Sequence, residues 1–336
     1  MPPVDSVPAN PVPAVAARYP WHESVWSTLT PQLDRLPHAL LLHGRPGLGK
    51  QAFAIQMAQT LLCAAPVSGL ACGQCQSCRL FAATNHPDFS FVGRLDEAKV
   101  IAVDQIRALN DFFSLRPHTA ARKVAVISPA DAMNPNAANS LLKLLEEPPL
   151  GSMLLLVTSH PARLLATLRS RCSHVLFKTP TLESGLVWLQ QQGGGKDAST
   201  PRFLALAGGA PLLAQSLIEE GYPDVHAQHL KDLDDLRSGR ENPSTCAARW
   251  KSAGARRGLS LIYEHVSGLI KTGLLTTASS VERPVPGNKK YKYEISELYE
   301  FIDVIHDSYR LLGGPLDELL MLENVLIRWA RLGHLH

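Results

Sequence analysis

Residues 44–51 form a glycine-rich turn of the kind that binds phosphate groups. The turn reads Gly44-Arg45-Pro46-Gly47-Leu48-Gly49-Lys50-Gln51 and matches the spacing G-x-x-x-x-G-K. Glycines let successive backbone N–H groups point inward, and the N-terminus of a following helix adds partial positive charge. Lys50 supplies a mobile cation for the outer phosphates. A Ser or Thr is expected next, but Gln51 follows, and its amide is a poor substitute for a hydroxyl ligand of Mg²⁺. The predicted nucleotide site therefore lacks one catalytic part.

Phosphoryl transfer also needs a carboxylate pair at the end of a neighbouring strand, where one acid holds Mg²⁺ and the other polarises water. The apolar run 124–127 is the predicted strand, and Ser128 and Pro129 stand where the two acids are expected. Asp131 comes three residues too late, and we interpret it as a loop or helix-approach carboxylate. Because metal ligand and base are both missing, we predict no intrinsic ATPase activity. Nucleotide binding itself stays open.

Four cysteines in one short segment have the spacing of metal ligands. They are Cys63, Cys72, Cys75 and Cys78, in the pattern C-x8-C-x2-C-x2-C. Four thiolates complete a tetrahedral Zn²⁺ shell and leave no open position, so residues 63–78 are predicted to be a structural zinc module. The alternatives are buried free thiols or a redox pair, but no strand-then-helix context frames a single C-x-x-C. Cys172 and Cys246 stand apart and are interpreted as core or half-buried residues.

Residues 169–172 read Arg-Ser-Arg-Cys and lie between a predicted helix and the last predicted strand. An arginine at a helix end can simply complement the negative end of the helix dipole. The alternative is an arginine finger, a guanidinium offered to a triphosphate that a neighbouring subunit binds. On physical chemistry alone the first interpretation is the simpler one, because basic residues are common at helix ends.

These residues need a scaffold of alternating strands and helices. Strands are predicted at 39–43, 88–92, 123–128, 153–158 and 174–177, and helices at 21–36, 50–63, 103–113, 134–147 and 161–168. Such alternation favours a parallel sheet with helices on both faces. We therefore predict an α/β core over residues 19–178, preceded by a flexible Pro- and Ala-rich leader at 1–18.

The strand signals end after residue 178. Short helices at 182–192, 201–207 and 211–220 predict a small helical lid over residues 179–221. Residues 222–336 are predicted to be helical, except for a surface loop at 281–292 that contains two prolines, a glycine and three lysines. The last helix carries an apolar face that fits either an internal core or an oligomer collar, formed by Leu319, Leu320, Leu322, Val325 and Leu326.

The bulk composition excludes several classes of protein. A chain of 336 residues with 45% hydrophobic content can bury a large core, in two or three domains. A net charge of +3 does not demand a nucleic-acid partner. No apolar run approaches the roughly 20 residues of a membrane span, and residues 1–13 lack the pattern of a signal peptide. We therefore expect the cytoplasm, where clustered cysteines indicate metal ligands rather than disulfides.

Taken together, four segments resemble the bacterial clamp-loader subunits of the AAA+ class. They are the glycine turn, the four-cysteine insert, the run NSLLKLLEEPP at 139–149 and the triplet at 170–172. Further matches are the triplets that begin at Tyr19 and His86, and residues 164–169. The resemblance is strong over 19–177, fair through the lid and weak beyond it. The leucine-rich run and the S-R-C triplet are specific to this family, whereas many NTPases share the glycine turn.

The resemblance implies an AAA+ P-loop core with a parallel sheet, a small helical lid and a C-terminal all-helical collar at 222–336 that closes a hetero-pentamer. In bacterial DNA replication that machine is the clamp loader of DNA polymerase III, which opens a sliding clamp and places it on primer-template DNA. The implied partners are its tau/gamma and delta subunits, the clamp and the DNA. Motor subunits keep the acidic pair and sense the γ-phosphate with a lid arginine, where this chain has Pro211. The S-R-C arginine reaches a neighbour's ATP, so Arg171 is expected to act in trans.

Two other functions are weighed against a non-hydrolysing clamp-loader subunit. An active motor-type ATPase of the tau/gamma kind would need an acidic pair after residue 127 and a hydroxyl at position 51. A zinc-dependent DNA-binding module would use residues 63–78 with Arg79 and Lys99, but Phe81 is the one aromatic residue there that could stack on bases.

Overall fold

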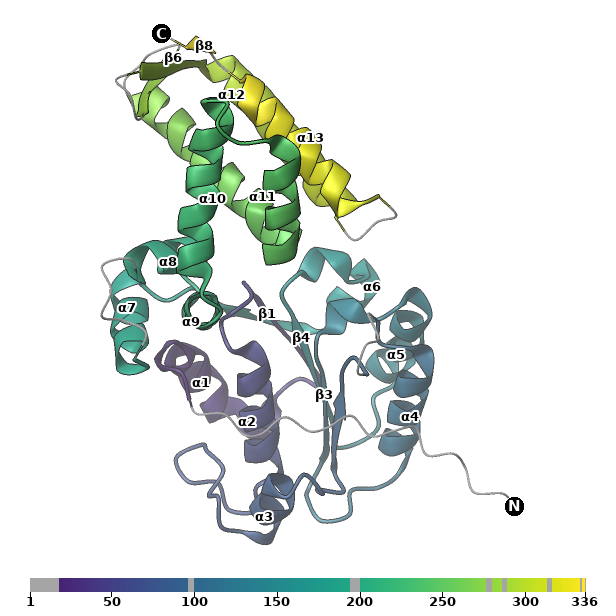
Figure 1. The fold of residues 1–336 in the computed structure, drawn as a ribbon. Helices are drawn as coiled ribbons and strands as arrows, with labels where there is room; N and C mark the ends of the chain where they lie inside the picture. The colour runs from purple at the N-terminus through teal and green to yellow at the C-terminus, as the bar shows by residue number, and fades with distance from the viewer. Residues whose placement is uncertain are drawn as a thin grey trace. The chain divides into compact units, whose positions relative to one another are not determined.

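The computed structural model describes residues 18–95, 100–193, 200–275, 280–285, 289–312, 316–332 and 334–335. The chain forms two compact units, Met1–Ser216 and Leu217–His336, shown in Figure 1. Residues 1–17 of the predicted leader lie outside the described residues, and so does Lys99.

A five-stranded sheet forms the centre of the first unit. Its strands are β1 (Ala39–Gly44), β2 (Phe89–Val92), β3 (Lys123–Ile127), β4 (Ser152–Thr158) and β5 (Ser173–Phe177). Their order in the sheet is β2-β3-β4-β1-β5, and every neighbouring pair is parallel. The three inner strands are almost wholly apolar, because both faces of the sheet are covered. The predicted α/β core with a parallel sheet is confirmed.

Helices cover both faces of this sheet (Figure 1). On one face lie α1 (Glu23–Leu29) and α2 (Lys50–Leu62), and on the other α4 (Val103–Ser114), α5 (Pro135–Glu146) and α6 (Ala166–Arg169). Successive residues of β1 alternate between the two layers: Leu40 and Leu42 join the first cluster, and Leu41 joins the second. The side chain of Asn134 caps α5 by accepting a hydrogen bond from the N–H of Ala137 over 2.8 Å.

Shorter helical pieces connect these elements. Three-residue 3₁₀ turns lie at Pro20–His22, Ala130–Ala132 and Pro161–Arg163, and a longer one lies at Thr30–Arg35. Helix α3 (Gln76–Ala82) begins directly after Cys75 and contains Cys78. The predicted helix 161–168 is divided into a 3₁₀ turn and α6, because Leu164 and Leu165 have extended backbone. The predicted lid helices are present as α7 (Leu182–Gln191), α8 (Thr200–Leu206) and α9 (Pro211–Glu219). The boundary between core and lid remains a prediction.

The described residues of the second unit form helices α10 (Tyr222–Arg237), α11 (Pro243–Leu275), α12 (Ile295–Leu311) and α13 (Glu318–Arg331). A non-helical residue, Gly254, interrupts α11 with φ of +105°. The core contains the buried rings of Trp250 and Trp329. On α13, Leu322, Val325 and Leu326 are buried in this core, Leu319 is partly buried and Leu320 is exposed. Most of the apolar face of α13 therefore serves the internal core.

The predicted surface loop at 281–292 is wrong. Strands β6 (Ser280–Val285) and β7 (Lys289–Glu294) pair antiparallel, and β8 (His334–Leu335) adds to β7. Val281 and Tyr293 face each other in the register and are both buried. Pro284 is tolerated because β6 is an edge strand. The C-terminal unit is therefore not purely helical, and the lysines that suggested a loop belong to a strand.

A buried polar cluster joins α10 to α11. The carboxylate of Asp232 accepts hydrogen bonds from Trp250 Nε1 at 3.0 Å and from Arg249 Nε at 3.2 Å. The His229 ring packs on the Trp250 ring with centroids 4.4 Å apart, and neither ring nitrogen of His229 has a hydrogen-bond partner among the described residues. Burial lowers the pKa of His229 to about 4, the Asp232 carboxylate opposes this shift, and the Arg249 cation adds to it.

In the part of the chain that the structure describes, no helix combines the length and the apolar character that crossing a membrane requires.

Candidate functional site

The glycine turn lies between the end of β1 and the start of α2, as predicted. Gly47 and Gly49 both adopt φ of +74°, a left-handed conformation that strains residues with a side chain. α2 then begins at Lys50, so its free N–H groups open toward the turn. The backbone therefore has the form of a phosphate-binding loop.

Lys50 turns its ammonium group toward oxygens of its own chain. Its Nζ donates to the Arg45 carbonyl over 2.6 Å and to Ser159 Oγ, just beyond β4, over 3.0 Å. The residue is only 5% exposed. Burial lowers the pKa of Lys50 to about 8, and the nearby Asp131 carboxylate opposes this shift. The cation that would bind the outer phosphates is already coordinated within the chain.

The two positions that lack catalytic groups contact each other. Ser128 Oγ, at the end of β3, donates a hydrogen bond to Gln51 Oε1 in the first turn of α2 over 2.8 Å. A hydroxyl at position 51 and an acid at position 128 would stand at this same place in an active site, holding Mg²⁺ between them. Here an amide and an alcohol satisfy each other, and neither brings the negative charge that would bind a divalent cation.

Asp131 lies in the 3₁₀ turn after β3, and its carboxylate is directed to β4. Thr158 Oγ1 donates to Asp131 Oδ1 over 2.6 Å, and His160 Nδ1 lies 3.4 Å from Asp131 Oδ2. These contacts bind the end of β4 to the turn after β3. The loop-carboxylate interpretation agrees with this position.

Side chains from two other segments cover the turn. A Cβ placed on Gly47 would lie 2.5 Å from Leu213 Cβ, and one placed on Gly49 would lie 2.5 Å from Tyr19 Cε2. The Gly47 carbonyl accepts a hydrogen bond from the N–H of Leu212 in α9 over 3.2 Å. The Leu48 carbonyl accepts from Trp21 Nε1 over 2.9 Å, and His22 Nε2 lies 2.7 Å from the same oxygen. The N-terminal segment and α9 thus pack directly against the turn.

Arg171 lies far from this turn in sequence, just after α6. Its side chain is 37% exposed. Its Nη2 forms an ion pair with Glu146 Oε1 over 2.8 Å, and its Nη1 donates to the Thr167 carbonyl over 3.0 Å. The next residue, Cys172, is buried in the core, and burial raises the pKa of its thiol to about 11. The guanidinium is therefore accessible, while its backbone is anchored.

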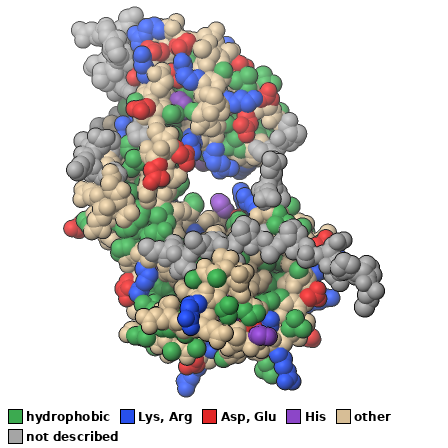
Figure 2. Space-filling model, turned by 60° about the horizontal axis from the view of Figure 1, so that its bottom comes forward, with side chains coloured by type: hydrophobic (Ala, Val, Ile, Leu, Met, Phe, Trp, Pro, Cys, Tyr) green, Lys and Arg blue, Asp and Glu red, His purple; other side chains and the backbone are tan. Residues whose placement is uncertain are grey.

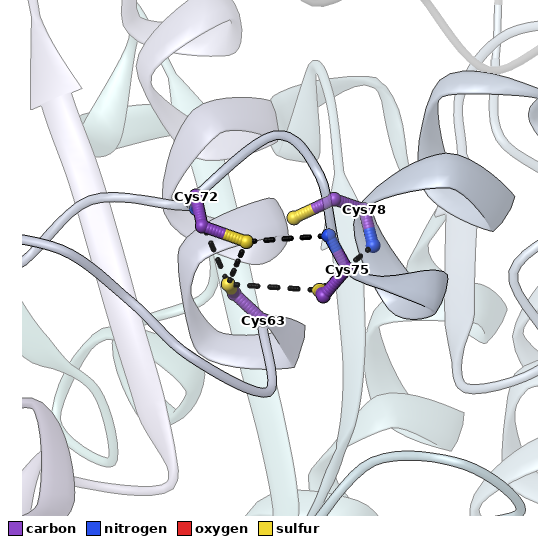
Figure 3. A group of neighbouring side chains, drawn as sticks. All are labelled: Cys63, Cys72, Cys75 and Cys78. Atoms are coloured by element: carbon purple, nitrogen blue, oxygen red, sulfur yellow. Dashed lines mark hydrogen bonds between the residues drawn. The ribbon is translucent and has the colours of Figure 1, made fainter.

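The four cysteines of residues 63–78 converge as the spacing predicts (Figure 3). Their sulfur atoms all lie within 4.8 Å of one another. Cys63 Sγ is 3.5 Å from Cys72 Sγ and 3.9 Å from Cys75 Sγ. In a tetrahedral site with Zn–S bonds of about 2.3 Å, sulfurs stand about 3.8 Å apart. The donor set therefore fits a metal ion such as zinc.

Backbone groups of the module are arranged to stabilise thiolates. The N–H of Cys72 donates to Cys63 Sγ, that of Cys75 to Cys72 Sγ, and that of Cys78 to Cys75 Sγ, over 3.3 to 3.4 Å. Burial works against ionisation of Cys75, but N–H bonds from Cys78 and Ala64 outweigh it and lower the pKa to about 6. A metal ion held by these four sulfurs would cross-link the end of α2 to α3.

A hydrogen-bond chain ties this module to the sheet. His86 Nδ1 accepts from the N–H of Asp88 over 3.1 Å, so His86 Nε2 carries the proton and donates to Ser77 Oγ over 2.8 Å. Ser77 Oγ in turn donates to the Leu62 carbonyl over 2.5 Å. The Asp88 carboxylate accepts from the N–H groups of residues 118, 119 and 120. Burial alone would raise the pKa of the Asp88 carboxyl, but these hydrogen bonds outweigh burial and lower the pKa below its ordinary value.

The one aromatic residue that could stack on bases in a DNA-binding module is buried. Phe81 is 2% exposed and packs on Phe89 with ring centroids 4.6 Å apart, so it is unavailable to a base. On the face shown in Figure 2, Lys and Arg side chains are interspersed with Asp and Glu. A concentrated basic surface, which non-specific DNA binding requires, is absent from that face.

The sheet order, the glycine turn between β1 and α2, and the helical segment after β5 define a P-loop protein of the AAA+ class. A sequence model of the family described as "DNA polymerase III, delta subunit" matches residues 22–181. The DNA polymerase III subunit delta' of Pseudomonas aeruginosa is 33% identical over 325 residues, which cover 94% of this chain and 98% of that protein. This chain belongs to the family of DNA polymerase III delta' subunits.

Two further proteins show the range of similarity. DNA polymerase III subunit gamma/tau of Mycobacterium bovis is 32% identical over 231 residues, which cover 66% of this chain and 40% of that protein. Among solved structures, a DNA polymerase III gamma subunit-related protein from Thermotoga maritima covers 91% of this chain and 98% of its own, with 16% identity and a TM-score of 0.45.

Several residues that contact these sites were not predicted from the sequence, among them Ser159, Tyr19 and Glu146. Ser159 holds Lys50, and no motif identifies it. Tyr19 covers Gly49, whereas the sequence indicated only that the triplet beginning at Tyr19 resembles the clamp-loader family. Glu146 pairs with Arg171 across 25 residues of sequence. The family-specific run that contains Glu146 was the one available signal, and it does not reveal the partner.

Proposed function

We propose that this chain is a non-hydrolysing subunit of a DNA polymerase III clamp loader, which helps to load the sliding clamp on primed DNA during replication. Its similarity to the Pseudomonas aeruginosa delta' subunit over almost the full length of both chains is the observation that carries this proposal. The partners are the tau/gamma and delta subunits in a hetero-pentamer, which brings the chain to the clamp and to DNA.

The absence of hydrolysis is proposed from the site itself. Gln51 and Ser128 satisfy each other where Mg²⁺ would be held, and Pro129 supplies no base. Lys50 is coordinated by Arg45 and Ser159. Nucleotide binding would have to break these contacts and displace side chains from the turn. We infer that the turn acts as a scaffold that neither hydrolyses nor retains ATP.

The chemical contribution of this chain is a cation for another subunit's ATP. The Arg171 guanidinium is accessible, and its planar group can donate several hydrogen bonds at once. A guanidinium placed against the phosphates stabilises the charge that develops during phosphoryl transfer. In this proposal Arg171 acts in trans, and Cys63, Cys72, Cys75 and Cys78 hold a structural Zn²⁺ ion.

The test is to assemble the chain with its tau/gamma and delta subunits and to compare wild type with Arg171→Ala. The substitution is expected to leave the hetero-oligomer intact and to reduce hydrolysis at the ATP site that receives Arg171 by about 10³-fold or more. The matched control is Arg163→Ala, an exposed arginine in the 3₁₀ turn of the same segment. Failure of the subunits to assemble would refute the clamp-loader role. Unchanged ATPase in an assembled Arg171→Ala complex would refute the finger alone.

The two competing functions are less well supported. An active motor of the tau/gamma kind needs acids and a hydroxyl where this chain has Ser128, Pro129 and Gln51. A zinc-dependent DNA-binding module would have Phe81 as its one residue for stacking on bases, and Phe81 is buried.

A further inference from the structure

Arg171 is held by two acceptors that come from different helices. Thr167 O belongs to α6, one turn before the arginine, whereas Glu146 is the last residue of α5. We propose that Glu146 is a positioning residue, which orients the Arg171 guanidinium for the phosphates of a neighbouring subunit. This inference rests on the proposed role of Arg171 as a finger in trans.

The backbone beneath the guanidinium is fixed first. Cys172 is buried in the same apolar cluster as Leu145 of α5 and Leu168 of α6, so the two helix ends are packed together. The N–H of Arg171 donates to the Leu168 carbonyl over 3.2 Å, and Ser170 Oγ donates to the Thr167 carbonyl over 3.1 Å. The Cα of Arg171 therefore has little freedom relative to the end of α5.

The side chain would still be mobile without a second anchor. Several bonds separate the Cα of arginine from its guanidinium, and each can rotate, so a fixed backbone leaves many positions for the charge. The bond to Thr167 O restrains one terminal nitrogen, and the pair with Glu146 restrains the other. Two anchors define the plane of the guanidinium, which one anchor cannot do.

The two anchors do not exhaust the donors. A guanidinium has five N–H groups, and two of them are used here, so three remain for phosphate oxygens. The pair is also half exposed, with side-chain exposures of 37% for Arg171 and 50% for Glu146. An ion pair in such a position contributes little to folding stability. Glu146 can therefore be replaced without unfolding the chain, which makes its effect on the finger measurable.

The next residue supplies a matched control. Glu147 is exposed, carries the same charge at the same helix end, and makes no ion pair among the described residues. Glu146→Gln and Glu147→Gln change the net charge of this helix end equally. A difference between them isolates the contact with Arg171 from the general electrostatic field.

The experiment uses the complete complex of this chain with its tau/gamma and delta subunits, and measures kcat and KM for ATP. Glu146→Gln is expected to lower kcat on the order of fivefold, the factor that corresponds to a pair of this exposure, with KM unchanged. Glu147→Gln is expected to match wild type. In the Arg171→Ala background, Glu146→Gln should add no further loss, because it acts through the arginine. Thermal unfolding of each variant checks that the fold is intact.

The outcomes separate the two proposals. If Arg171→Ala lowers kcat but Glu146→Gln equals wild type, the finger stands and the positioning role is refuted. An increase in kcat for Glu146→Gln would show that the glutamate withholds the finger, which also refutes it. Equal losses from Glu146→Gln with and without Arg171 would assign the effect to another contact. If Arg171→Ala has no effect in an assembled complex, both proposals are refuted.

Discussion

Ser128 donates a hydrogen bond to Gln51 over 2.8 Å, and this bond joins two places where an active P-loop ATPase holds its Mg²⁺ ion. The replacements are thus complementary. Gln51 without Ser128, or Ser128 without Gln51, would lack its present hydrogen-bond partner. Together the two side chains occupy the place of the Mg²⁺ ion with an uncharged contact. Lys50 adds to this arrangement, because its ammonium group already donates to Arg45 O and Ser159 Oγ.

The isolated chain is expected to release no phosphate from ATP above background and to show no saturable binding of a fluorescent ATP analogue. Neither Gln51 nor Ser128 brings a carboxylate to the place of Mg²⁺, and the Ser128 hydroxyl there already donates to Gln51. Lys50 would also have to give up two oxygen partners. Phosphate-release assays and fluorescence anisotropy measure the two properties, and a purified tau/gamma subunit serves as the positive control. Turnover or binding that disappears in Lys50→Ala would contradict the scaffold interpretation.

The purified chain is expected to contain one zinc ion, and Cys75→Ser is expected to lose it. Free zinc at a thousand times its Kd stabilises a protein that binds it only when folded by about 4 kcal/mol, so chelation should lower the denaturation midpoint clearly. Metal content is measured by elemental analysis and stability by urea unfolding. Cys246→Ser, which alters a buried cysteine outside the module, should retain the metal. Full zinc content in a variant that replaces both Cys72 and Cys75 with serine would show that the sulfurs are not its ligands.

Stability of the second unit is expected to fall as the pH drops below about 6.5. The pKa of His229 is about 4 in the folded chain, below its ordinary value of 6.5. At pH values between the two pKa values, His229 is protonated in the unfolded chain but neutral in the folded chain. The free energy of unfolding therefore decreases as the pH falls, by up to about 3 kcal/mol. Above pH 6.5 His229 is neutral in both states and contributes no slope.

The comparison for that prediction is His229→Phe, which keeps a ring against Trp250 and removes the titrating group. Urea unfolding between pH 4.5 and 7.5, about the range in which histidine changes charge, should give a shallower pH dependence for this variant. His306→Phe replaces an exposed histidine of α12 and is expected to keep the wild-type slope. Identical slopes for His229→Phe and wild type would assign the acid sensitivity to other groups.

Much of the fold was accessible from local patterns. Inner strands of a parallel sheet are covered on both faces, so runs such as 124–127 are uninterrupted and apolar, and they stand out between amphipathic helices. The start of α5 could be predicted because asparagine, here Asn134, is a residue type that caps helices. The hairpin of β6 and β7 was missed because its prolines and lysines resemble a loop, while the burial of Tyr293 depends on packing against helices distant in sequence.

In the candidate site, too, local features could be predicted from the sequence and long-range contacts could not. Ligand sets that lie close together in sequence, such as the cysteines of residues 63–78, can be predicted because chemistry and spacing coincide. Contacts across the fold cannot. Nothing in the sequence shows that Gln51 meets Ser128, that Glu146 meets Arg171, or that Tyr19 lies on Gly49, because each depends on tertiary packing.

The close approach of Leu213 to Gly47 explains why a site without catalytic residues keeps a glycine of the phosphate-binding pattern. Any side chain at position 47 would collide with Leu213 and would also be strained by the left-handed backbone. A chain with this architecture would therefore lose stability on replacing the glycine, whether or not a phosphate ever reaches it. Selection for folding alone can preserve such a glycine, so genome surveys that count ATPases by this pattern would include proteins that no longer use ATP.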